Sequence, residues 1–454
     1  MNGRWIGYLS RRLTPTRIFI LGFAGFILLG TAVLCLPASA GVRPLSFVDA
    51  LFTATSGVCV TGLTVIDIGR DLSGFGQALT LVLFQVGGLG IITFSVMLLS
   101  ILGRGISFKD REIVQSTFFH VPRRDFLKLI RTILSITMLI EGIGALLLFV
   151  RFSRDFPPGQ ALYQAVFHSV SAFNNCGYSL FSSSLTAYRH DGWINAVVMA
   201  LIVLGGIGFV VQIELIARWR RRIRALSLHS KIVLRMTLFL IVAGAALFLL
   251  FETGHALKGG PLPSSLLTAA FQSVTARTCG FNTVDIGLLT NSTLLLLMLL
   301  MFIGAAPGSS GGGIKVTSFS LVMLLIWSRI KGQEGVNVFQ RTIPREVLTR
   351  TVAIIIAAVL VIFIAVSLLL LTDPHSGEAA GQNRQYFIMY LFETVSAFGT
   401  VGLSMGITPE LGAIQKVVVT VLMFIGRVGP ITLAYAWADR ARGLTYAEES
   451  VMVG

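Results

Sequence analysis

The chain has 454 residues, of which 54% are hydrophobic and 13% are charged, whereas about 25% of the residues in an ordinary soluble domain are charged. Its 36 basic and 21 acidic residues give a formal net charge of +15, which would indicate a nucleic-acid partner in a soluble protein. No soluble domain of useful size fits between the apolar segments. The composition therefore argues against a water-soluble enzyme, and we expect no nucleic-acid partner.

Eight apolar runs are long enough to cross a hydrocarbon core of ~30 Å, which takes about 20 residues per helix. The sixth run is too long for one straight span. The sequence thus predicts an all-α membrane protein with eight transmembrane helices. In chain order the runs lie near 18–36, 77–102, 129–150, 193–217, 232–251, 290–327, 347–372 and 413–436.

Basic residues gather at the N-terminus, at the C-terminus and in the loops 103–128, 218–231 and 328–346. Lys and Arg near span ends stay on the cytoplasmic side of a membrane. We therefore expect a multi-pass protein of the cell membrane with both termini in the cytoplasm. The arginine cluster at 218–224 could grip RNA or a protein, but we interpret it as a topological anchor that contacts lipid head groups.

Four short polar segments share one pattern, in which a Phe is followed by a hydroxyl residue four positions later and by a Gly nine or ten positions later. The four copies are 52–62, 167–177, 271–280 and 392–402. They are too short to cross the membrane and carry side chains that lipid excludes. We expect each to be a re-entrant half-helix followed by extended chain, buried in protein or facing a water-filled cavity.

These segments divide the chain into four pseudo-symmetric repeats, each made of a span, a re-entrant pore helix and a second span around a central pore. The expected parts are a cytoplasmic N-terminus at 1–17, repeats at 18–105, 125–220, 230–330 and 345–438, and a C-terminal tail at 439–454.

The residues around the four glycines include no carboxylate, so a cation at this axis would be coordinated by backbone carbonyls. Glycine permits positive φ, which lets adjacent carbonyls turn toward one axis. A ring of carbonyls can replace the hydration shell of a monovalent cation, and the negative ends of the half-helix dipoles favour a cation there. The residues expected to form this selectivity filter are Val60, Thr61, Gly62, Asn175, Cys176, Gly177, Thr278, Cys279, Gly280, Thr400, Val401 and Gly402.

With these four segments, the chain resembles the Trk/Ktr/HKT superfamily of potassium transporters, in which four unequal units on one chain form a pore. The filter glycines of that family correspond to Gly62, Gly177, Gly280 and Gly402. Only about 17 residues precede the first span, so the resemblance is strongest to the membrane subunit of the Ktr branch, because the Trk branch usually has two extra N-terminal helices.

The resemblance implies potassium uptake, often sodium-dependent, by a homodimer docked on a cytoplasmic ring of nucleotide-binding RCK subunits. It also implies K⁺ in the pore, with Na⁺ as a second ion, and no covalently bound cofactor. The chain contains no phosphate-cradling G-x-x-x-x-G-K-[ST] motif, so control by ATP would come from another chain. Such a chain would dock on the basic loops and on the tail at Arg440 and Arg442.

The second spans of units three and four share the stretches 300–304 and 422–426, and then diverge. Unit four continues with Arg427, whereas unit three inserts a stretch rich in glycine in which no helix persists. A flexible loop just below a filter can obstruct permeation, so we interpret it as the gate, as the family resemblance also implies; a helix kink packed against its neighbours is the alternative. The expected gate residues are Gly304, Ala305, Ala306, Pro307, Gly308, Ser309, Ser310, Gly311, Gly312, Gly313 and Arg427.

Four cationic or acidic side chains lie at membrane depth, where a charge normally has a partner. For Arg427 we expect loop carbonyls as the acceptors. Arg277 and Lys315 could repel cations in the pore, but pairing is the more common outcome for such a charge. The candidate partners are Glu393, Asp285, Asp67 or a carbonyl. Glu141 could be a proton or ion ligand, or a residue of helix packing.

The cysteines beside the filter glycines could form a soft-metal site, but we interpret Cys59, Cys176 and Cys279 as small hydrophobes. An intramembrane enzyme would need paired Asp, a His cluster or a Ser/His dyad, and the six scattered histidines indicate none. An alternating-access secondary cation transporter is the alternative function. It would show two inverted repeats rather than four parallel segments.

Overall fold

The computed structural model describes residues 15–101, 126–373 and 380–437. Most of the expected basic loop at 103–128, the tail at 439–454 and its Arg440 and Arg442 lie outside these residues. Within them the chain is almost entirely helical, as expected, and a single two-stranded antiparallel hairpin pairs Asn337 with Thr342 and Val338 with Arg341.

The helices before the gate stretch are α2 (Pro15–Leu34), α3 (Phe47–Val58), α4 (Ile68–Asp71), α5 (Gly74–Ile101), α7 (Phe126–Phe152), α8 (Pro158–Phe173), α9 (Gly192–Gly206), α10 (Phe209–Trp219), α11 (Leu228–Glu252), α12 (Leu262–Thr275) and α13 (Asn291–Phe302). After it come α14 (Val316–Ile330), β1 (Asn337–Val338), β2 (Arg341–Thr342), α15 (Arg345–Leu371), α16 (Ala380–Gly399), α17 (Ala413–Val428) and α18 (Pro430–Trp437). Short 3₁₀ turns lie at Pro37–Ser39, Thr186–Tyr188, Ile286–Leu288 and Thr408–Glu410.

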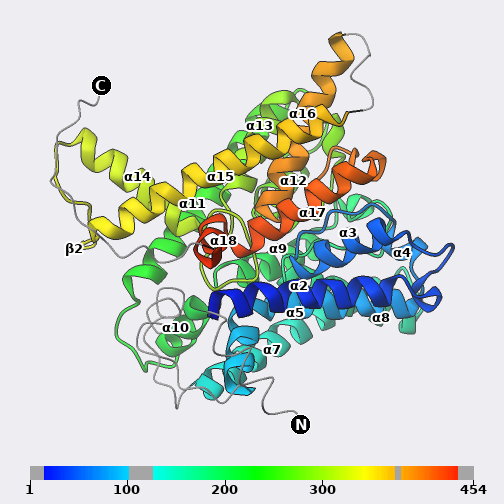
Figure 1. Ribbon diagram of the computed structural model, residues 1–454, viewed down its shortest axis with the longest axis horizontal. Helices are drawn as coiled ribbons and strands as arrows, with labels where there is room; N and C mark the ends of the chain where they lie inside the picture. The colour runs from blue at the N-terminus through cyan, green and yellow to red at the C-terminus, as the bar shows by residue number, and fades with distance from the viewer. Residues whose placement is uncertain (1–14, 102–125, 374–379, 438–454) are drawn as a thin grey trace.

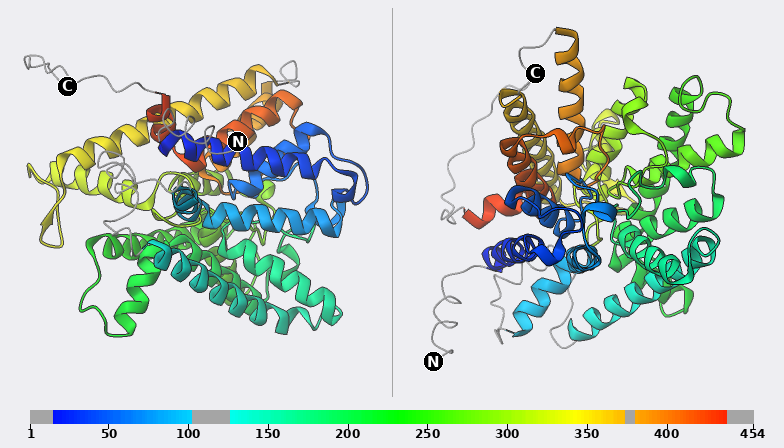
Figure 2. Two further views of the ribbon diagram at one scale, coloured as in Figure 1. Left: turned by 60° about the horizontal axis from the view of Figure 1, so that its bottom comes forward. Right: turned by 90° about the vertical axis from the view of Figure 1, so that its right-hand side faces the viewer.

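Each expected re-entrant segment forms a helix that packs against a longer helix of its own unit: α3 on α2, α8 on α7, α12 on α11 and α16 on α15. Helix α16 also packs against α17. The blue, teal, green and orange parts of the chain surround one central region in the right-hand view of Figure 2. The β hairpin lies at the far end of α14 and α15, away from that region (Figure 1). The repeated Phe of each segment is fully buried and so anchors the short helix in the core. These residues are Phe52, Phe167, Phe271 and Phe392.

The apolar run at 193–217 is not the single helix that we expected. It forms α9 and α10, which meet at an angle of 103°, and Gly208 between them has a φ of 89°. The break leaves backbone groups that a continuous helix would have used. They bond to the stretch after α13 instead, since Gly206 O accepts from Ala306 N at 3.0 Å and Phe209 N donates to Gly308 O at 2.9 Å. The break therefore follows from a tertiary contact.

Two other expected spans are also interrupted. The run at 290–327 divides into α13 and α14 around residues 303–315, as its length predicted, and the run at 413–436 divides into α17 and α18 at Gly429, just before Pro430. Among the described residues, three helices are long and apolar enough to cross a membrane alone, at Ile130–Phe152, Leu228–Glu252 and Arg345–Leu371, and the bent pair α9 and α10 qualifies together. The total of eight spans stays a prediction.

Candidate functional site

The turns that follow α3, α8, α12 and α16 share one uncommon backbone conformation. In each turn two residues with positive φ flank one residue without it, and alternating the sign of φ lets successive carbonyls face the same side. A positive φ is uncommon outside glycine and persists only where the surroundings enforce it. The values are 56°, 57°, 78° and 50° at Val60, Asn175, Thr278 and Thr400, and 88°, 75°, 92° and 92° at Gly62, Gly177, Gly280 and Gly402.

The four glycines lie in a closed ring. A methyl group added to any of them would overlap the carbonyl oxygen of the residue before the next glycine, so only glycine fits. The order runs from the first turn to the second, third and fourth, and then returns to the first. The distances from such a methyl carbon are 2.0 Å from Gly62 to Cys176 O, 2.0 Å from Gly177 to Cys279 O, 2.1 Å from Gly280 to Val401 O and 2.2 Å from Gly402 to Thr61 O. The twelve expected filter residues are thus brought together in one place.

The hydroxyl residue of the repeated pattern fastens the turn to the end of its own helix. In three units the hydroxyl donates a hydrogen bond to the carbonyl of the residue after the glycine. In the fourth, Ser396 Oγ accepts from Gly402 N at 3.1 Å. The three donors are Ser56 to Leu63 O at 2.8 Å, Ser171 to Tyr178 O at 2.8 Å and Thr275 to Phe281 O at 2.6 Å. The pattern read from the sequence therefore has a structural cause.

Removing one of these hydroxyls should loosen its turn. We expect Ser171→Ala to lower the free energy of unfolding by about 1–3 kcal/mol, because the buried Tyr178 carbonyl loses its side-chain donor. Thermal unfolding of the purified protein in detergent measures this change. Ser367→Ala is the matched control, because Ser367 is only partly buried and its hydroxyl bonds within its own helix, to Phe363 O. Equal unfolding temperatures for the two variants would contradict the proposed role of the hydroxyl.

The expected gate stretch lies directly against the ring. Gly312 N donates to Thr400 Oγ1 at 3.0 Å, and a methyl group on Gly311 would lie 2.2 Å from Thr278 Oγ1. The stretch is held from several sides, because Ser310 N donates to Gly205 O at 3.4 Å and Gly313 N donates to Gly426 O at 3.3 Å. Residues 304–313 are therefore packed between the filter turns and the second helices of units two and four.

Arg427 is 3% exposed and connects three parts of the chain. Its guanidinium donates to Ser310 O, which is the kind of loop carbonyl that the sequence led us to expect, and to Gly87 O on α5. The second acceptor could not be read from the sequence, since Gly87 lies 340 positions away. Arg427 thus ties the gate stretch to unit one.

The other two cations at this depth also bond to neutral oxygen atoms. Lys315 Nζ donates to Gly311 O at 2.8 Å. Arg277 lies 3.5 Å from Thr237 O and 3.4 Å from Thr237 Oγ1. Of the partners considered for Arg277, a carbonyl is the one observed, while Glu393 bonds to the hydroxyl of Thr408 instead.

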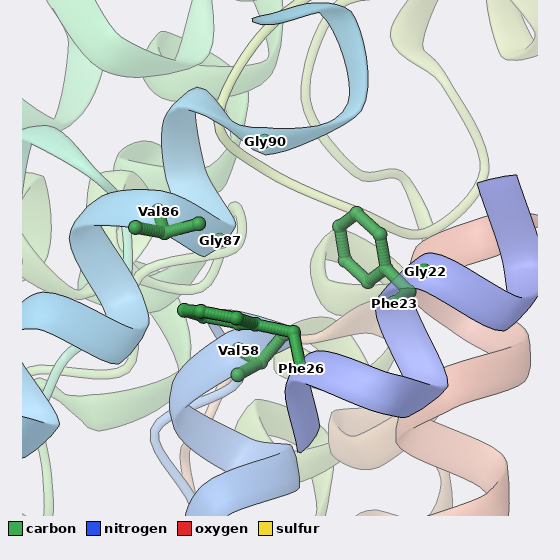
Figure 3. Close-up of a pocket in the computed structure, with 7 residues that line it drawn as sticks. All are labelled: Gly22, Phe23, Phe26, Val58, Val86, Gly87 and Gly90. Atoms are coloured by element: carbon green, nitrogen blue, oxygen red, sulfur yellow. The ribbon is translucent and has the colours of Figure 1, made fainter. Parts of the chain in front are cut away.

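A small apolar pocket lies beside this arrangement, between α2, α3 and α5 (Figure 3). Phe23 and Phe26 face Val58 and Val86 across it, and Gly87 lies on its wall. The pocket has no polar side chain among its lining residues, so no side chain there offers a ligand for a cation. It borders the peptide group whose carbonyl Arg427 binds.

Comparison with known proteins gives consistent results. The family model described as TrkH, cation transport protein, matches residues 29–441. The Ktr system potassium uptake protein B of Bacillus subtilis is 36% identical over 98% of this chain and 97% of the relative. The protein of the same name from Vibrio alginolyticus is 37% identical over 96% of this chain and 94% of the relative. The potassium/sodium uptake protein NtpJ of Enterococcus hirae is 35% identical over 98% of both chains.

The fold has a match among solved structures. The crystal structure of the potassium transporter TrkH from Vibrio parahaemolyticus aligns with a TM-score of 0.69 at 19% identity, covering 93% of this chain and 84% of that chain. The family resemblance carried by the four repeated segments is therefore confirmed, and the chain belongs to the TrkH family of cation transport proteins.

Proposed function

We propose that this protein takes up potassium across the cell membrane through the ring formed by its four filter turns. The observation that supports this most directly is the circular order of the turns, in which each glycine packs on a carbonyl of the next unit and the fourth packs on the first. Such a closed ring of main-chain oxygen atoms suits a dehydrated monovalent cation. The names of the relatives support potassium as that cation.

The same ring bears on the choice between the two candidate classes of transporter. Two inverted repeats would bring broken helices together in pairs, whereas here four turns of the same local conformation follow one another around a circle. This arrangement supports a pore rather than an alternating-access site. Each turn has one glycine instead of the two of a tetrameric potassium-channel loop, so we expect fewer strict coordination sites and weaker exclusion of Na⁺.

The stretch at 304–313 would act as the gate of this pore. Its support is its position against Thr278 and Thr400, together with its attachment to α17 through Arg427. Opening would require the stretch to leave the filter turns, and Arg427 would hold it in the closed position.

Regulation and assembly follow from the family resemblance. We propose a homodimer on a cytoplasmic RCK-type ring of nucleotide-binding subunits. This ring would contact the basic cytoplasmic side of the chain, where Lys231 and Arg235 lie over the aromatic ring of Phe339 in the turn of the β hairpin. We also propose that Na⁺ takes part in uptake, and the Enterococcus hirae relative is named a potassium/sodium uptake protein. Surrounding membrane lipid would contact the basic cluster at 218–224.

Uptake of ⁸⁶Rb⁺ by proteoliposomes tests the proposal. We expect unlabelled K⁺ to compete with Rb⁺ at lower concentration than Na⁺ does, and Na⁺ to compete measurably, because carbonyl rings with one glycine each offer fewer strict sites. Empty liposomes are the control. Absence of Rb⁺ uptake above that control would reject the potassium pore, and complete exclusion of Na⁺ would reject the weak-selectivity expectation.

A further inference from the structure

Glu141 lies in the middle of α7 and is 5% exposed. Its two carboxyl oxygens are contacted by neutral amides only, with Gln85 Nε2 at 3.1 Å from Oε2 and Asn174 Nδ2 at 2.9 Å from Oε1. Asn174 caps the end of α8 and directly precedes the filter residue Asn175. This cluster therefore joins α5, α7 and the second filter turn.

No cation compensates this carboxyl group among the described residues. The helices that pack against α7 are α5, α8 and α9, and their sequences contain no Lys, Arg, Asp or Glu. The titratable groups of α8 are engaged elsewhere, because the ring of His168 bonds to Gln164 O and Ser179 Oγ and the hydroxyl of Tyr163 bonds to Gln77. On α7 itself the nearest charged residues, Arg131 and Arg151, are ten positions away, about 15 Å along a helix.

The cluster also offers the carboxyl group few hydrogens. Asn174 Nδ2 lies close to three oxygen atoms, at 2.7 Å from Gln85 Oε1, 2.9 Å from Glu141 Oε1 and 2.8 Å from Val170 O. An amide nitrogen carries only two hydrogens, and Val170 O also accepts from Asn174 N at 3.0 Å. Among the described residues, Glu141 therefore has one amide donor for each carboxyl oxygen and no charged partner. In addition, Asn174 Oδ1 is buried without a hydrogen-bond partner among the described residues.

Glu252 is a second buried carboxyl group of this chain, and it has a different set of hydrogen-bond donors. It is also fully buried, but it accepts from Thr290 N and Thr290 Oγ1 at 2.9 Å each and from Ala256 N at 3.1 Å. Each of these donors has its own hydrogen, and backbone N–H donors favour an ionised carboxylate. Glu252 can therefore stay ionised, whereas Glu141 has no backbone donor of this kind among its contacts.

We propose that Glu141 is a proton-binding site that is occupied at neutral pH and whose proton holds the Gln85 and Asn174 side chains in place beside the second filter turn. Release of this proton to water at alkaline pH leaves a carboxylate at membrane depth with only neutral amide donors beside it, where a charge is unfavourable. The cluster then rearranges around Asn174. The effect on transport rests on the proposed pore function, whereas the presence of the proton does not.

Infrared difference spectroscopy of the full-length protein in lipid vesicles tests for the proton. We expect wild-type protein minus Glu141→Gln at neutral pH to show the carbonyl-stretch band of a protonated carboxyl group, and this band to disappear from the difference at alkaline pH. Wild type minus Glu252→Gln is the matched control and should show only carboxylate bands. Gln85→Met should shift the frequency of the Glu141 band, because it removes the Nε2 contact. A carboxylate band for Glu141 at neutral pH would overturn the proposal.

Uptake of Rb⁺ into the same vesicles tests the coupling to the filter. Wild-type uptake should fall about threefold or more from neutral to alkaline pH, and uptake by Glu141→Gln should stay within about twofold, because an amide cannot ionise. Parallel pH profiles for the two proteins would overturn the coupling. A Na⁺-dependent rise in thermal stability that Glu141→Gln abolishes would overturn the proton in favour of a sodium ligand. Lack of uptake by every protein at every pH would count against the pore and leave the infrared result unaffected.

Discussion

Serine in place of any one of the four ring glycines should reduce Rb⁺ uptake by about 100-fold, which corresponds to ~2.7 kcal/mol in barrier height. The reason is steric: at Gly62 and Gly177 the new Cβ would lie 2.0 Å from the carbonyl oxygen of the neighbouring turn. That carbonyl has to move, and with it an oxygen atom that would face the ion in the proposed pore. Because the ring is closed, we expect the loss at each of the four positions, including Gly280 and Gly402. Initial rates of ⁸⁶Rb⁺ uptake by proteoliposomes measure the effect.

A serine at a ring glycine has two costs, the backbone strain at positive φ and the steric overlap of its Cβ. Gly406→Ser is the control that carries only the first. Gly406 has a φ of 96°, so a serine there is strained in the same way, but nothing lies within 4 Å of the added Cβ. We expect this variant to transport within about threefold of wild type, since a residue in left-handed backbone costs of order 1–3 kcal/mol in stability. Normal uptake by a ring variant that is folded would contradict the assignment of the ring as the ion path.

Arg427→Ala should raise Rb⁺ uptake about five- to tenfold. Arg427 holds the gate stretch through Ser310 O and anchors it on α5 through Gly87 O, and a hydrogen bond from a charged group contributes about 1.5–3 kcal/mol. Without these bonds the stretch should leave the filter turns more often. The initial rate of uptake and limited proteolysis at the stretch together report on the change.

Lys416→Ala is the matched control, because Lys416 is a second cation of α17 and pairs with Asp49 on α3 rather than with the gate stretch. Its uptake should equal that of wild type. Arg427→Lys should lie between wild type and Arg427→Ala, since a single ammonium group cannot reproduce two guanidinium contacts in fixed geometry. Uptake by Arg427→Ala at the wild-type rate, with an unchanged proteolysis pattern, would show that Arg427 does not hold the gate stretch closed.

The sequence was informative where a local pattern recurs. Phe52 and its three counterparts, each followed by a hydroxyl residue and a glycine, predicted four re-entrant helices with polar turns, and the structure contains helices and turns at those positions. The hydroxyl at Ser56 could be assigned to the pattern but not to its acceptor, Leu63 O. A pattern of this kind identifies what each segment is, because backbone conformation depends mainly on nearby residues.

What the sequence could not supply is which distant backbone each segment meets. The run at 193–217 was expected to be one span because it is apolar throughout, yet Gly206 and Phe209 bond to the gate stretch and the helix turns by 103° between them. In the sequence, the residue that could have indicated the break is Gly208, which the structure shows at a positive φ. The second acceptor of Arg427 and the amide partners of Glu141 likewise depend on contacts between segments far apart in the chain.

The circular order of the turns has a genetic consequence. When four identical subunits surround an axis, one altered codon changes the turn of every subunit at once. In this chain each of the four turns is encoded by its own codons. The turns already differ in chemistry, with a thiol in the middle position at Cys176 and Cys279, a hydroxyl at Thr61 and an isopropyl group at Val401. A natural substitution can therefore change the residues of one turn while the other three turns keep theirs.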